Sequence, residues 1–507
     1  FARTLISLGV KRGDHVAIWA TNVPQWYITF WATVKIGAVL VTVNTAYKIY
    51  EAEYLLRQSD THTLVMTEGY KDTSYTDIIA KLCPELATTP KDKPLYSKRL
   101  PFLRHVITVG CEQQGCLTWD ESLELAENTP VWEVYRRAAA VNKNDVCNMQ
   151  YTSGTTGFPK GVMLTHYNVV NNGKNIGDCM DLSTADRLMI QVPMFHCFGM
   201  VLAMTASITH GTTLCPIPYF SPRVSLDCIN KLQITAFHGV PTMFIAMLEH
   251  KDFATTDFSH MRTGIMAGSP CPIKVMQDVI EKMHMPEICI TYGQTEASPG
   301  CTMSKTTDSI EDRVNTVGGA MFGVECKIVD PETGKELPDN VDGEFVARGY
   351  NIMKGYYKMP HATAQAIDAD GWLHTGDLAR RLPNGYFKIT GRIKDMIIRG
   401  GENIYPKEIE DFIYTNPKVK DVQVIGVPDK QYGEEIMACV IKKDDSLTEE
   451  ELREYIKANL AKHKVPRYIA FVDSFPMNAA GKILKYKMRE QAVESLSLQD
   501  ASKIETA

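Results

Sequence analysis

Hydrophobic positions in the first half of the chain form short apolar runs that alternate with longer amphipathic segments. The apolar runs predict β-strands at His15–Ala20, Ala38–Val43, His62–Thr67, Val106–Val109, Ile234–Val240 and Gly264–Gly268. Helical patterns lie between several of these runs, and such alternation is typical of α/β layers around largely parallel sheets. We therefore expect layered α/β subdomains up to about Ser269.

The pattern changes twice toward the C-terminus. From about Gly318 to Thr390, short β-like runs are separated by loops rich in Pro, Gly, Asn and Asp, which predicts a β-rich subdomain. Beyond it, strand-like runs in MIIRGG, VKDVQVIGVPD and EEIMACVIKK accompany a helix predicted over Ser446–His463. Thr448 and Glu451 have the spacing of a capping box at the start of that helix.

These changes divide the chain into two expected domains. Residues 1–392 form a large N-terminal domain, which includes the β-rich subdomain at about 318–390, and residues 393–507 form a small α+β domain. The predicted fold class is therefore α/β with several sheets, plus a small mobile α+β C-terminal domain. Because Phe1 already lies in an amphipathic helical pattern, we expect residues to precede it in the full gene product.

Composition excludes several classes of function. With 507 residues, a net charge of −6 and no basic tract, the chain has no feature of a nucleic-acid-binding protein. Thirteen cysteines occur without a repeated metal-ligand spacing, which argues against structural zinc. Unpaired thiols fit a reducing cytosol, so we expect a cytoplasmic protein, unless an organelle-targeting segment precedes Phe1.

One uncharged stretch, Leu188–Ile208, has about the length of a membrane span. Polar residues and a proline interrupt it, namely Gln191, Pro193, His196, Thr205 and Ser207. We interpret it as buried core and pocket wall, and we expect no integral membrane segment.

The run YTSGTTGFPKG, from Tyr151 to Gly161, contains three glycines, four Ser or Thr hydroxyls and one lysine between an apolar strand-like segment and a helix-like one. Such a loop can turn tightly and direct backbone N–H groups, hydroxyls and an ammonium toward phosphate oxygens. Composition alone would also fit a solvated turn. It is not a Walker A loop, because Pro159 rather than glycine precedes Lys160.

The ordered string resembles the phosphate loop of the acyl-adenylate-forming superfamily, which includes acyl-CoA synthetases, aryl-CoA ligases, luciferases and amino-acid adenylation domains. PMFHCFG, AGSPCP, ITYGQTEAS, GWLHTGDLA, ITGRIKDMIIRGGENIYPKEIE and PMNAAGKILK follow in the same order as the family's motifs. The resemblance covers nearly the whole chain. It implies ATP, Mg²⁺ and coenzyme A as reaction components.

The resemblance also assigns residues to the nucleotide. Asp377 is implied to bind both ribose hydroxyls, Arg392 to contact the nucleotide, and Thr295 to face the α-phosphate. Glu296 is the implied magnesium carboxylate, with Thr155 as a second ligand, and a hard cation suits such oxygen ligands. The complete implied nucleotide set is Thr152, Ser153, Gly154, Thr155, Thr156, Gly157, Lys160, Gly268, Ser269, Tyr292, Gly293, Gln294, Thr295, Asp377, Arg392 and Lys482.

Other implied roles concern the acid, coenzyme A and domain motion. His196 is implied to lie beside the substrate carboxylate, although an isolated histidine in an apolar run is more often a core residue. Lys482 matches the family's catalytic lysine, and Lys394 matches its hinge. Gly400 and Gly401 are implied to line the path of the pantetheine arm. The expected acyl pocket comprises His196, His238, Val240, Met266 and Ala267.

These assignments predict an AMP-forming acyl-CoA synthetase that acts on a fatty acid, most similar in sequence to medium-chain or family-2 acyl-CoA synthetases. Catalysis would depend on Lys482, His196, Thr295 and Glu296, with rotation of the C-terminal domain between the two half-reactions. An amino acid is disfavoured as the substrate because His196 and Cys197 stand where an acidic residue would be needed. A homodimer is one expected assembly.

Three alternatives remain open at this point. The first is an aryl-acid CoA ligase for benzoate or cinnamate, because the motifs distinguish such enzymes poorly from fatty-acid enzymes. An acyl-AMP ligase would pass its product to a carrier protein, although no insertion is evident between Asp377 and Arg392. A binding protein without turnover would be expected to have lost Lys482, Glu296 or Arg392, and all three are present.

Overall fold

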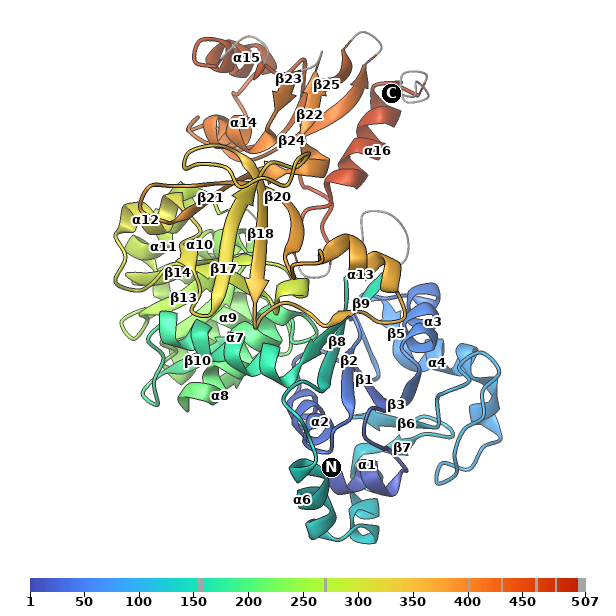
Figure 1. Ribbon diagram of the computed structural model, residues 1–507. Helices are drawn as coiled ribbons and strands as arrows, with labels where there is room; N and C mark the ends of the chain where they lie inside the picture. The colour runs from blue at the N-terminus through green and yellow to red at the C-terminus, as the bar shows by residue number, and fades with distance from the viewer. Residues whose placement is uncertain are drawn as a thin grey trace.

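The computed structural model describes residues 1–152, 159–268, 271–399, 402–429, 432–460, 464–478 and 481–499. Two large sheets, a four-stranded sheet and a C-terminal sheet account for nearly all strands in these ranges. The C-terminal elements lie at one end of the molecule, above the layered elements of the rest of the chain (Figure 1). Within the described ranges, no helix is long and apolar enough to cross a membrane.

The first large sheet has eight strands, and its central strands are parallel. Their spatial order is β19 (Gly355–Tyr356), β9 (Lys160–Thr165), β8 (Val146–Thr152), β2 (Val39–Thr42), β1 (His15–Trp19), β3 (Thr61–Thr67), β6 (His105–Val109) and β7 (Leu117–Thr118). A small hairpin of β4 (Gly69–Tyr70) and β5 (Thr73–Ser74) is separate from it.

The second large sheet has seven strands, of which the first five in spatial order are parallel. They are β11 (Thr213–Pro216), β10 (Arg187–Ile190), β12 (Ala236–Gly239), β13 (Thr263–Met266) and β14 (Glu287–Gly293), followed by the antiparallel β15 (Gly300–Met303) and β16 (Gly319–Ala320). The six strands expected from the first half of the chain are therefore all present, with ends shifted by one or two residues.

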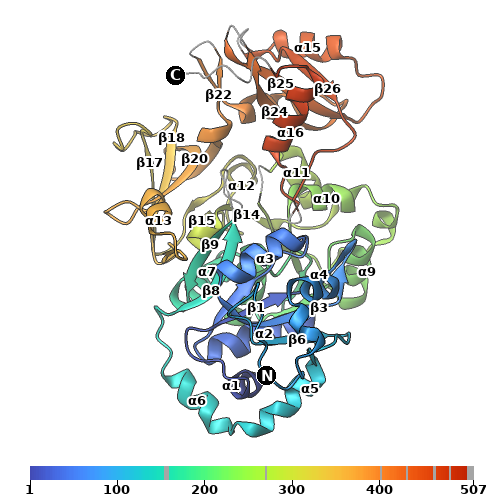
Figure 2. The same ribbon diagram turned by 90° about the vertical axis from the view of Figure 1, so that its right-hand side faces the viewer.

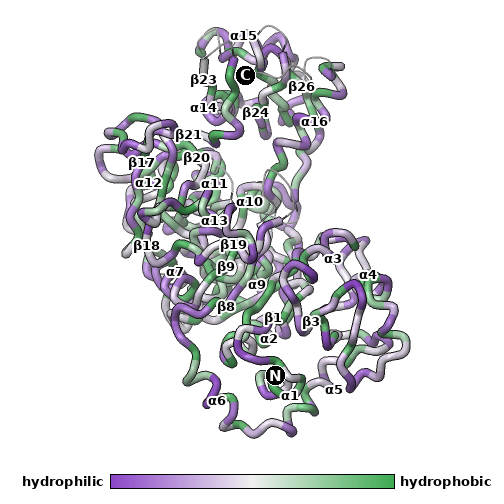
Figure 3. The backbone as a smooth tube through the Cα atoms, turned by 45° about the vertical axis from the view of Figure 1, so that its right-hand side comes forward, coloured by the Kyte–Doolittle hydropathy of each residue, from purple (hydrophilic) through white to green (hydrophobic). Residues whose placement is uncertain are grey.

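Helices cover both faces of these sheets, because the apolar strands are buried on both sides. One hydrophobic core contains residues of both sheets and of α2 (Pro24–Lys35), α7 (His166–Cys179) and the π-helix η3 (Phe198–Thr205). The outer face of the first sheet packs on α3 (Ile49–Gln58) and α4 (Tyr75–Leu82). The outer face of the second packs on α9 (Pro222–Leu232), α10 (Pro241–Leu248) and α11 (Ile273–Lys282). Apolar segments gather between these layers (Figure 3).

The shorter helical segments connect or flank these layers. They are α1 (Ala2–Ser7), η1 (Pro84–Ala87), α5 (Trp119–Glu124), η2 (Leu125–Asn128), α6 (Val131–Ala139), α8 (Ala206–His210), η4 (Lys251–Thr255), η5 (Thr295–Ala297), α12 (Ile310–Asn315) and α13 (Pro360–Ala366). The stretch Leu188–Ile208 becomes β10, η3 and part of α8, which agrees with its interpretation as core.

The β-rich segment forms an antiparallel sheet of β17 (Val324–Val329), β18 (Gly343–Gly349), β20 (Leu373–Arg381) and β21 (Phe387–Arg392). The C-terminal sheet contains β23 (Glu402–Ile404), β22 (Ile397–Arg399), β25 (Gly433–Lys442), β24 (Val419–Asp429) and β26 (Tyr468–Phe471), with α14 (Pro406–Ile413), α15 (Glu449–Lys457) and α16 (Lys485–Ser495). Its residues form two cores of their own, and Figure 2 shows it set apart from the large sheets.

Three local expectations are wrong. The segment after the phosphate loop is β9 rather than a helix, since Lys160–Thr165 pairs with β8 as an antiparallel hairpin. The C-terminal helix ends at Lys457, well before the expected His463, which lies outside the described residues. Its Thr448 hydroxyl accepts from the Glu451 N–H at 3.2 Å, but the Glu451 carboxylate pairs with Lys418 instead of completing a capping box.

Candidate active site

The β8–β9 hairpin carries the phosphate loop. Thr152 and Lys160 face each other in the last pair of the ladder, so β8 ends and β9 begins at the same end of the hairpin. Thr152 and Lys160 are the predicted loop residues that the structure describes. The remainder of that prediction, together with Ser269 and the predicted coenzyme A glycines, lies outside the described residues: Ser153, Gly154, Thr155, Thr156, Gly157, Ser269, Gly400 and Gly401.

Glu296 lies beside this hairpin, on the short helix η5 that follows β14. Its Oε1 accepts a hydrogen bond from the Tyr356 hydroxyl at 2.8 Å and a longer one from the Thr152 hydroxyl at 3.4 Å. The Met353 N–H donates to the Glu296 carbonyl at 2.8 Å, which fixes the backbone. Because Mg²⁺ bound with nucleotide needs few protein carboxylates in addition to phosphate oxygens, this single carboxylate fits the expected metal.

The turn before Glu296 requires small residues and close backbone contact. A Cβ on Gly293 would lie 1.7 Å from the Pro299 carbonyl oxygen, so no side chain fits there. The Gln294 N–H donates to the same carbonyl at 3.0 Å. Thr295 is buried at the start of η5. The sequence YGQTE therefore folds into a tight turn that presents Glu296 next to the phosphate loop.

Asp377 and Arg392 form an ion pair across β20 and β21. Their strand register places them opposite each other, and Arg392 Nε lies 2.7 Å from Asp377 Oδ1. The Tyr292 hydroxyl donates to Asp377 Oδ2 at 2.8 Å. Burial, followed by the Asp377 charge, raises the pKa of Tyr292 well above its ordinary value, so this tyrosine stays a donor. Three predicted nucleotide residues from distant segments thus meet at one buried carboxylate.

The turn that carries Lys482 lies against the end of β12. The Lys482 N–H donates to Asn478 Oδ1 at 2.9 Å, and the Asn478 N–H donates to the Lys482 carbonyl at 2.8 Å. Gly481 has a φ of 80°, and a Cβ there would lie 3.1 Å from a methyl group of Val240. Glycine is therefore needed both for the left-handed backbone and for close approach.

Lys482 interacts electrostatically with the predicted site. Although its side chain keeps an exposed surface, loss of water around the ammonium group, followed by the charge of Arg392, lowers the pKa of Lys482 to about 8. Asp377, Asp395 and Glu296 act in the opposite direction. Lys482 and Glu296 are more than 180 residues apart in the sequence. In the fold, Lys482 belongs to the same group of interacting charges as Glu296.

His196 lies where the first core meets this cluster. Its Nδ1 accepts from the Phe198 N–H at 3.1 Å, which leaves Nε2 as the protonated nitrogen of the neutral ring. Burial, followed by the charge of Lys482, lowers the pKa of His196 to about 4. At neutral pH the ring is therefore an uncharged N–H donor, suited to a carboxylate oxygen.

His238 has a structural role. Its Nε2 lies 2.9 Å from the Leu202 carbonyl, and its Nδ1 accepts from the Ile265 N–H at 3.2 Å. Both ring nitrogens are thus occupied by backbone groups. Its ring stacks on Phe198, a residue with no predicted role, with centroids 5.8 Å apart.

The other predicted pocket residues divide between the two faces of the second sheet. Val240 and Ala267 belong to the same core as Phe198, and the space next to Gly268 is bounded by Val240 and Phe198. Met266 packs in the core on the opposite face, as the alternation of side chains along a strand requires. The structure therefore separates Met266 from the rest of the expected pocket.

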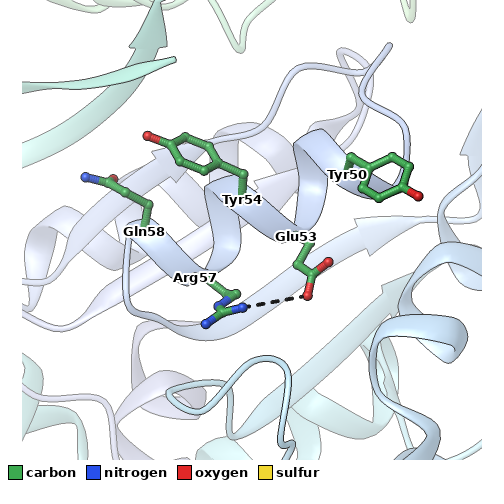
Figure 4. Close-up of a pocket in the computed structure, with 5 residues that line it drawn as sticks. All are labelled: Tyr50, Glu53, Tyr54, Arg57 and Gln58. Carbon is green, nitrogen blue, oxygen red and sulfur yellow. Dashed lines mark ion pairs between the residues drawn. The ribbon is translucent and has the colours of Figure 1, made fainter. Parts of the chain in front are cut away.

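A surface depression of about 390 Å³ lies along α3 and is lined by Tyr50, Glu53, Tyr54, Arg57 and Gln58 (Figure 4). Tyr50 is 83% exposed, so the depression opens to solvent. The Tyr54 hydroxyl donates to the Pro159 carbonyl at 3.0 Å. We interpret this helix as a support for the phosphate loop rather than as part of the site around Lys482.

Comparison with known proteins identifies the family. The description "AMP-binding enzyme" matches residues 1–357, and "AMP-binding enzyme C-terminal domain" matches residues 408–482. The chain belongs to the AMP-binding enzyme family. YngI of Bacillus subtilis (strain 168), whose name assigns it provisionally to the acyl-CoA synthetases, is 51% identical over 502 residues, which are 99% of this chain and 91% of YngI. The mitochondrial medium-chain acyl-CoA ligase ACSF2 of Bos taurus is 40% identical over 507 residues, which cover 98% of this chain and 82% of ACSF2.

Solved structures of AMP-binding enzymes share the fold. ATP-bound MatB from Rhodopseudomonas palustris has a TM-score of 0.83 at 30% identity, covering 97% of this chain and 91% of MatB. The anthranilate CoA ligase AuaEII in complex with anthranoyl-AMP has a TM-score of 0.85 at 26% identity, covering 98% and 90%. These matches confirm the predicted family, the α/β fold class and the acyl-CoA synthetase class.

The buried histidines predict that acid destabilises this AMP-binding enzyme. Burial lowers the pKa of His238 to about 4, whereas an unfolded histidine titrates near 6.5. Its contribution to stability is therefore present above pH 6.5 and is lost as the pH falls toward 4. Linkage predicts a loss of about 2 kcal/mol between pH 7 and 5 from this group alone.

Urea denaturation of the wild type and His238→Gln at pH 7 and 5 measures this contribution. We expect the wild type to lose about 2 kcal/mol more than the variant between the two pH values, because glutamine does not titrate. Equal pH dependence of the two proteins would show that His238 is not held neutral by burial.

Proposed function

We propose that this chain ligates a medium-chain fatty acid to coenzyme A through an acyl-adenylate, with release of pyrophosphate and then AMP. The observation that carries the proposal is the ion pair of Arg392 with Asp377, together with the electrostatic influence of Lys482 on this pair, Glu296 and His196. This cluster combines donors for a carboxylate and cations for phosphates with a carboxylate suited to Mg²⁺. It therefore provides what condensation of an acid with ATP requires.

In the first half-reaction, a carboxylate oxygen of the acid attacks the α-phosphorus of ATP, and the bond to the pyrophosphate oxygen breaks. The charge that develops on the α-phosphate is stabilised by the ammonium of Lys482, in a preorganised site. The neutral His196 ring donates from Nε2 to the acid and orients it. Mg²⁺, bound with the nucleotide at Glu296, would neutralise phosphate charge. In the second half-reaction, the coenzyme A thiolate attacks the acyl carbonyl and AMP leaves.

The apolar tail of the acid is proposed to lie along Phe198, Val240 and Ala267. All three side chains are buried in one apolar core, and pockets of this kind favour hydrocarbon over charged groups. Similarity to ACSF2 supports a medium-chain acid. Similarity to AuaEII supports an aryl acid as the second candidate.

A panel of straight-chain acids with benzoate and cinnamate separates these candidates. We expect kcat/KM for thioester formation to be highest at about six to twelve carbons, because the proposed tail site is apolar and the medium-chain ligase ACSF2 is 40% identical to this chain. A maximum at benzoate or cinnamate would reassign the chain to the aryl-acid ligases. Transfer to a carrier protein instead of coenzyme A would favour the acyl-AMP ligase.

The two-domain division also belongs to this proposal. Residues 1–392 would form the adenylation domain and residues 393–507 a mobile lid, with the hinge near Lys394 on η6 (Ile393–Asp395). The separate sheet and cores of the C-terminal segment support independent movement. Lys420 Nζ lies 2.6 Å from Glu249 Oε2 in an exposed ion pair between the two sides, and exposed pairs of this kind contribute little to stability. In this proposal, the observed arrangement, with Lys482 near the site, is the one that forms the adenylate.

A cytoplasmic location and a homodimer stay predictions. ATP and coenzyme A are the co-substrates of the proposed reaction, and Mg²⁺ is its proposed metal.

A further inference from the structure

Tyr356 occupies a fixed position between the phosphate-loop hairpin and Glu296. It lies on β19, where it pairs with Val162 of β9 at the edge of the first sheet. Its N–H donates to the Thr363 hydroxyl at 2.9 Å, and the N–H of the next residue, Tyr357, donates to the Gly161 carbonyl at 2.8 Å. With only 8% of its surface exposed, the ring has little freedom to move.

The side chain of Tyr356 contacts two groups of opposite charge. Its hydroxyl donates to Glu296 Oε1 at 2.8 Å. The ammonium of Lys160 lies 4.9 Å from the centroid of its ring, within the range of a cation–π interaction. Lys160 and Glu296 form no ion pair with each other in the described part of the chain, although both reach the same aromatic side chain.

Direct pairing of Lys160 with Glu296 would impair both residues. A lysine bound to a carboxylate has less positive charge to offer a phosphate, and a carboxylate bound to a lysine is a weaker ligand for a divalent cation. An aromatic ring between them leaves Lys160 available to a phosphate and Glu296 available to a divalent cation. The ring face interacts with the ammonium, and the hydroxyl holds Oε1 of the carboxylate. The other oxygen, Oε2, has no hydrogen-bond partner among the residues that the structure describes, so it can serve a metal.

We propose that Tyr356 is a positioning residue that orients the Glu296 carboxylate for the metal of the metal–nucleotide complex and keeps Lys160 from neutralising it. The proposal rests on the proposed function, because it assumes that Glu296 and Lys160 serve a nucleotide with a divalent cation. The Tyr356 hydroxyl donates to the carboxylate in the observed hydrogen bond. Tyr356 itself need not touch the substrate.

Two substitutions separate the two contacts, and a neighbouring tyrosine supplies the control. Tyr356→Phe removes the hydroxyl and keeps the ring between Lys160 and Glu296. Tyr356→Leu removes both. Tyr357→Phe is the matched control, because the Tyr357 hydroxyl donates to Asp60 at 2.9 Å, away from Glu296.

The probe is Mn²⁺, followed by the electron paramagnetic resonance signal of the free ion, with a non-hydrolysable ATP analogue present. Nucleotide affinity without metal is measured by calorimetry in EDTA. For Tyr356→Phe we expect Mn²⁺ affinity to fall about tenfold, as for other groups that orient a metal ligand, and metal-free nucleotide affinity to stay within about twofold of wild type. For Tyr356→Leu we expect both affinities to fall, and for Tyr357→Phe neither.

Unchanged Mn²⁺ affinity in Tyr356→Phe would overturn the proposal. Tighter Mn²⁺ binding would also overturn it, because Tyr356 would then compete with the metal instead of orienting its ligand. Failure of the proposed function has a different signature. In that case the wild type itself would release no pyrophosphate with any acid, whereas failure of the Tyr356 proposal alone would leave wild-type pyrophosphate release intact.

Discussion

Replacing Lys482 with methionine will slow pyrophosphate release from ATP and acid by about 10²–10³-fold, the effect of removing one preorganised donor from a transition state. The same variant will form thioester from a synthetic acyl-adenylate and coenzyme A at close to the wild-type rate. The reason is that Lys482 lies in the charge cluster of Arg392, Asp377 and Glu296, where the α-phosphate of ATP is proposed to react, and it has no proposed role once the adenylate has formed. Stopped-time assays of each half-reaction measure the two rates separately.

Lys487→Met is the matched control for Lys482→Met. Lys487 is an exposed lysine on the adjacent helix α16, and its replacement should leave both half-reactions unchanged. Equal losses of both half-reactions in Lys482→Met would show that this lysine holds the fold or the coenzyme A site and is not specific to adenylation.

Replacing Lys394 with proline will impair thioester formation and spare adenylation, the opposite of the effect expected for Lys482→Met. Proline fixes φ at about −65°, a value that a 3₁₀-helix accepts, and Lys394 lies in such a helix, η6. We therefore expect the observed backbone to accept proline, and we expect the fixed φ to restrict rotation of the C-terminal domain about this residue. We expect Lys394→Pro to keep adenylation within about threefold of wild type and to lose thioester formation by about 10²-fold or more, because closure steps of this kind control turnover.

Lys394→Ala is its control, since alanine removes the side chain without restricting the backbone. It should support both half-reactions. Full thioester formation by Lys394→Pro would place the hinge elsewhere or show that the lid does not rotate.

Sequence motifs predicted which residues are chemically important, but not how they pair. Asp377 and Arg392 were each assigned to the nucleotide, and their contact with each other depends on the register of β20 and β21. Tyr356 carries no charge and resembles any strand tyrosine. Its importance arises only because three distant segments bring Lys160, Glu296 and its own ring together.

The errors in the fold have similar causes. The segment KGVMLT after the phosphate loop is a short apolar run, which periodicity cannot assign to a helix or a strand; pairing with β8 makes it a strand. The expected acyl pocket contains both Met266 and Ala267, but the two side chains pack in different cores because successive residues along a strand face opposite sides. The alternation of side chains along a strand is therefore the sequence signal that separates Met266 from Ala267.

Parallel measurement of pyrophosphate release and free-thiol loss tests most directly whether this chain forms an acyl-CoA thioester through an acyl-adenylate. The wild-type protein is incubated with ATP, Mg²⁺, coenzyme A and the best acid of the panel. Our expectation is that pyrophosphate release and thiol loss proceed at equal rates and that thiol loss stops when ATP is omitted. Pyrophosphate release without thiol loss would contradict it, since the chain would then stop at the acyl-adenylate.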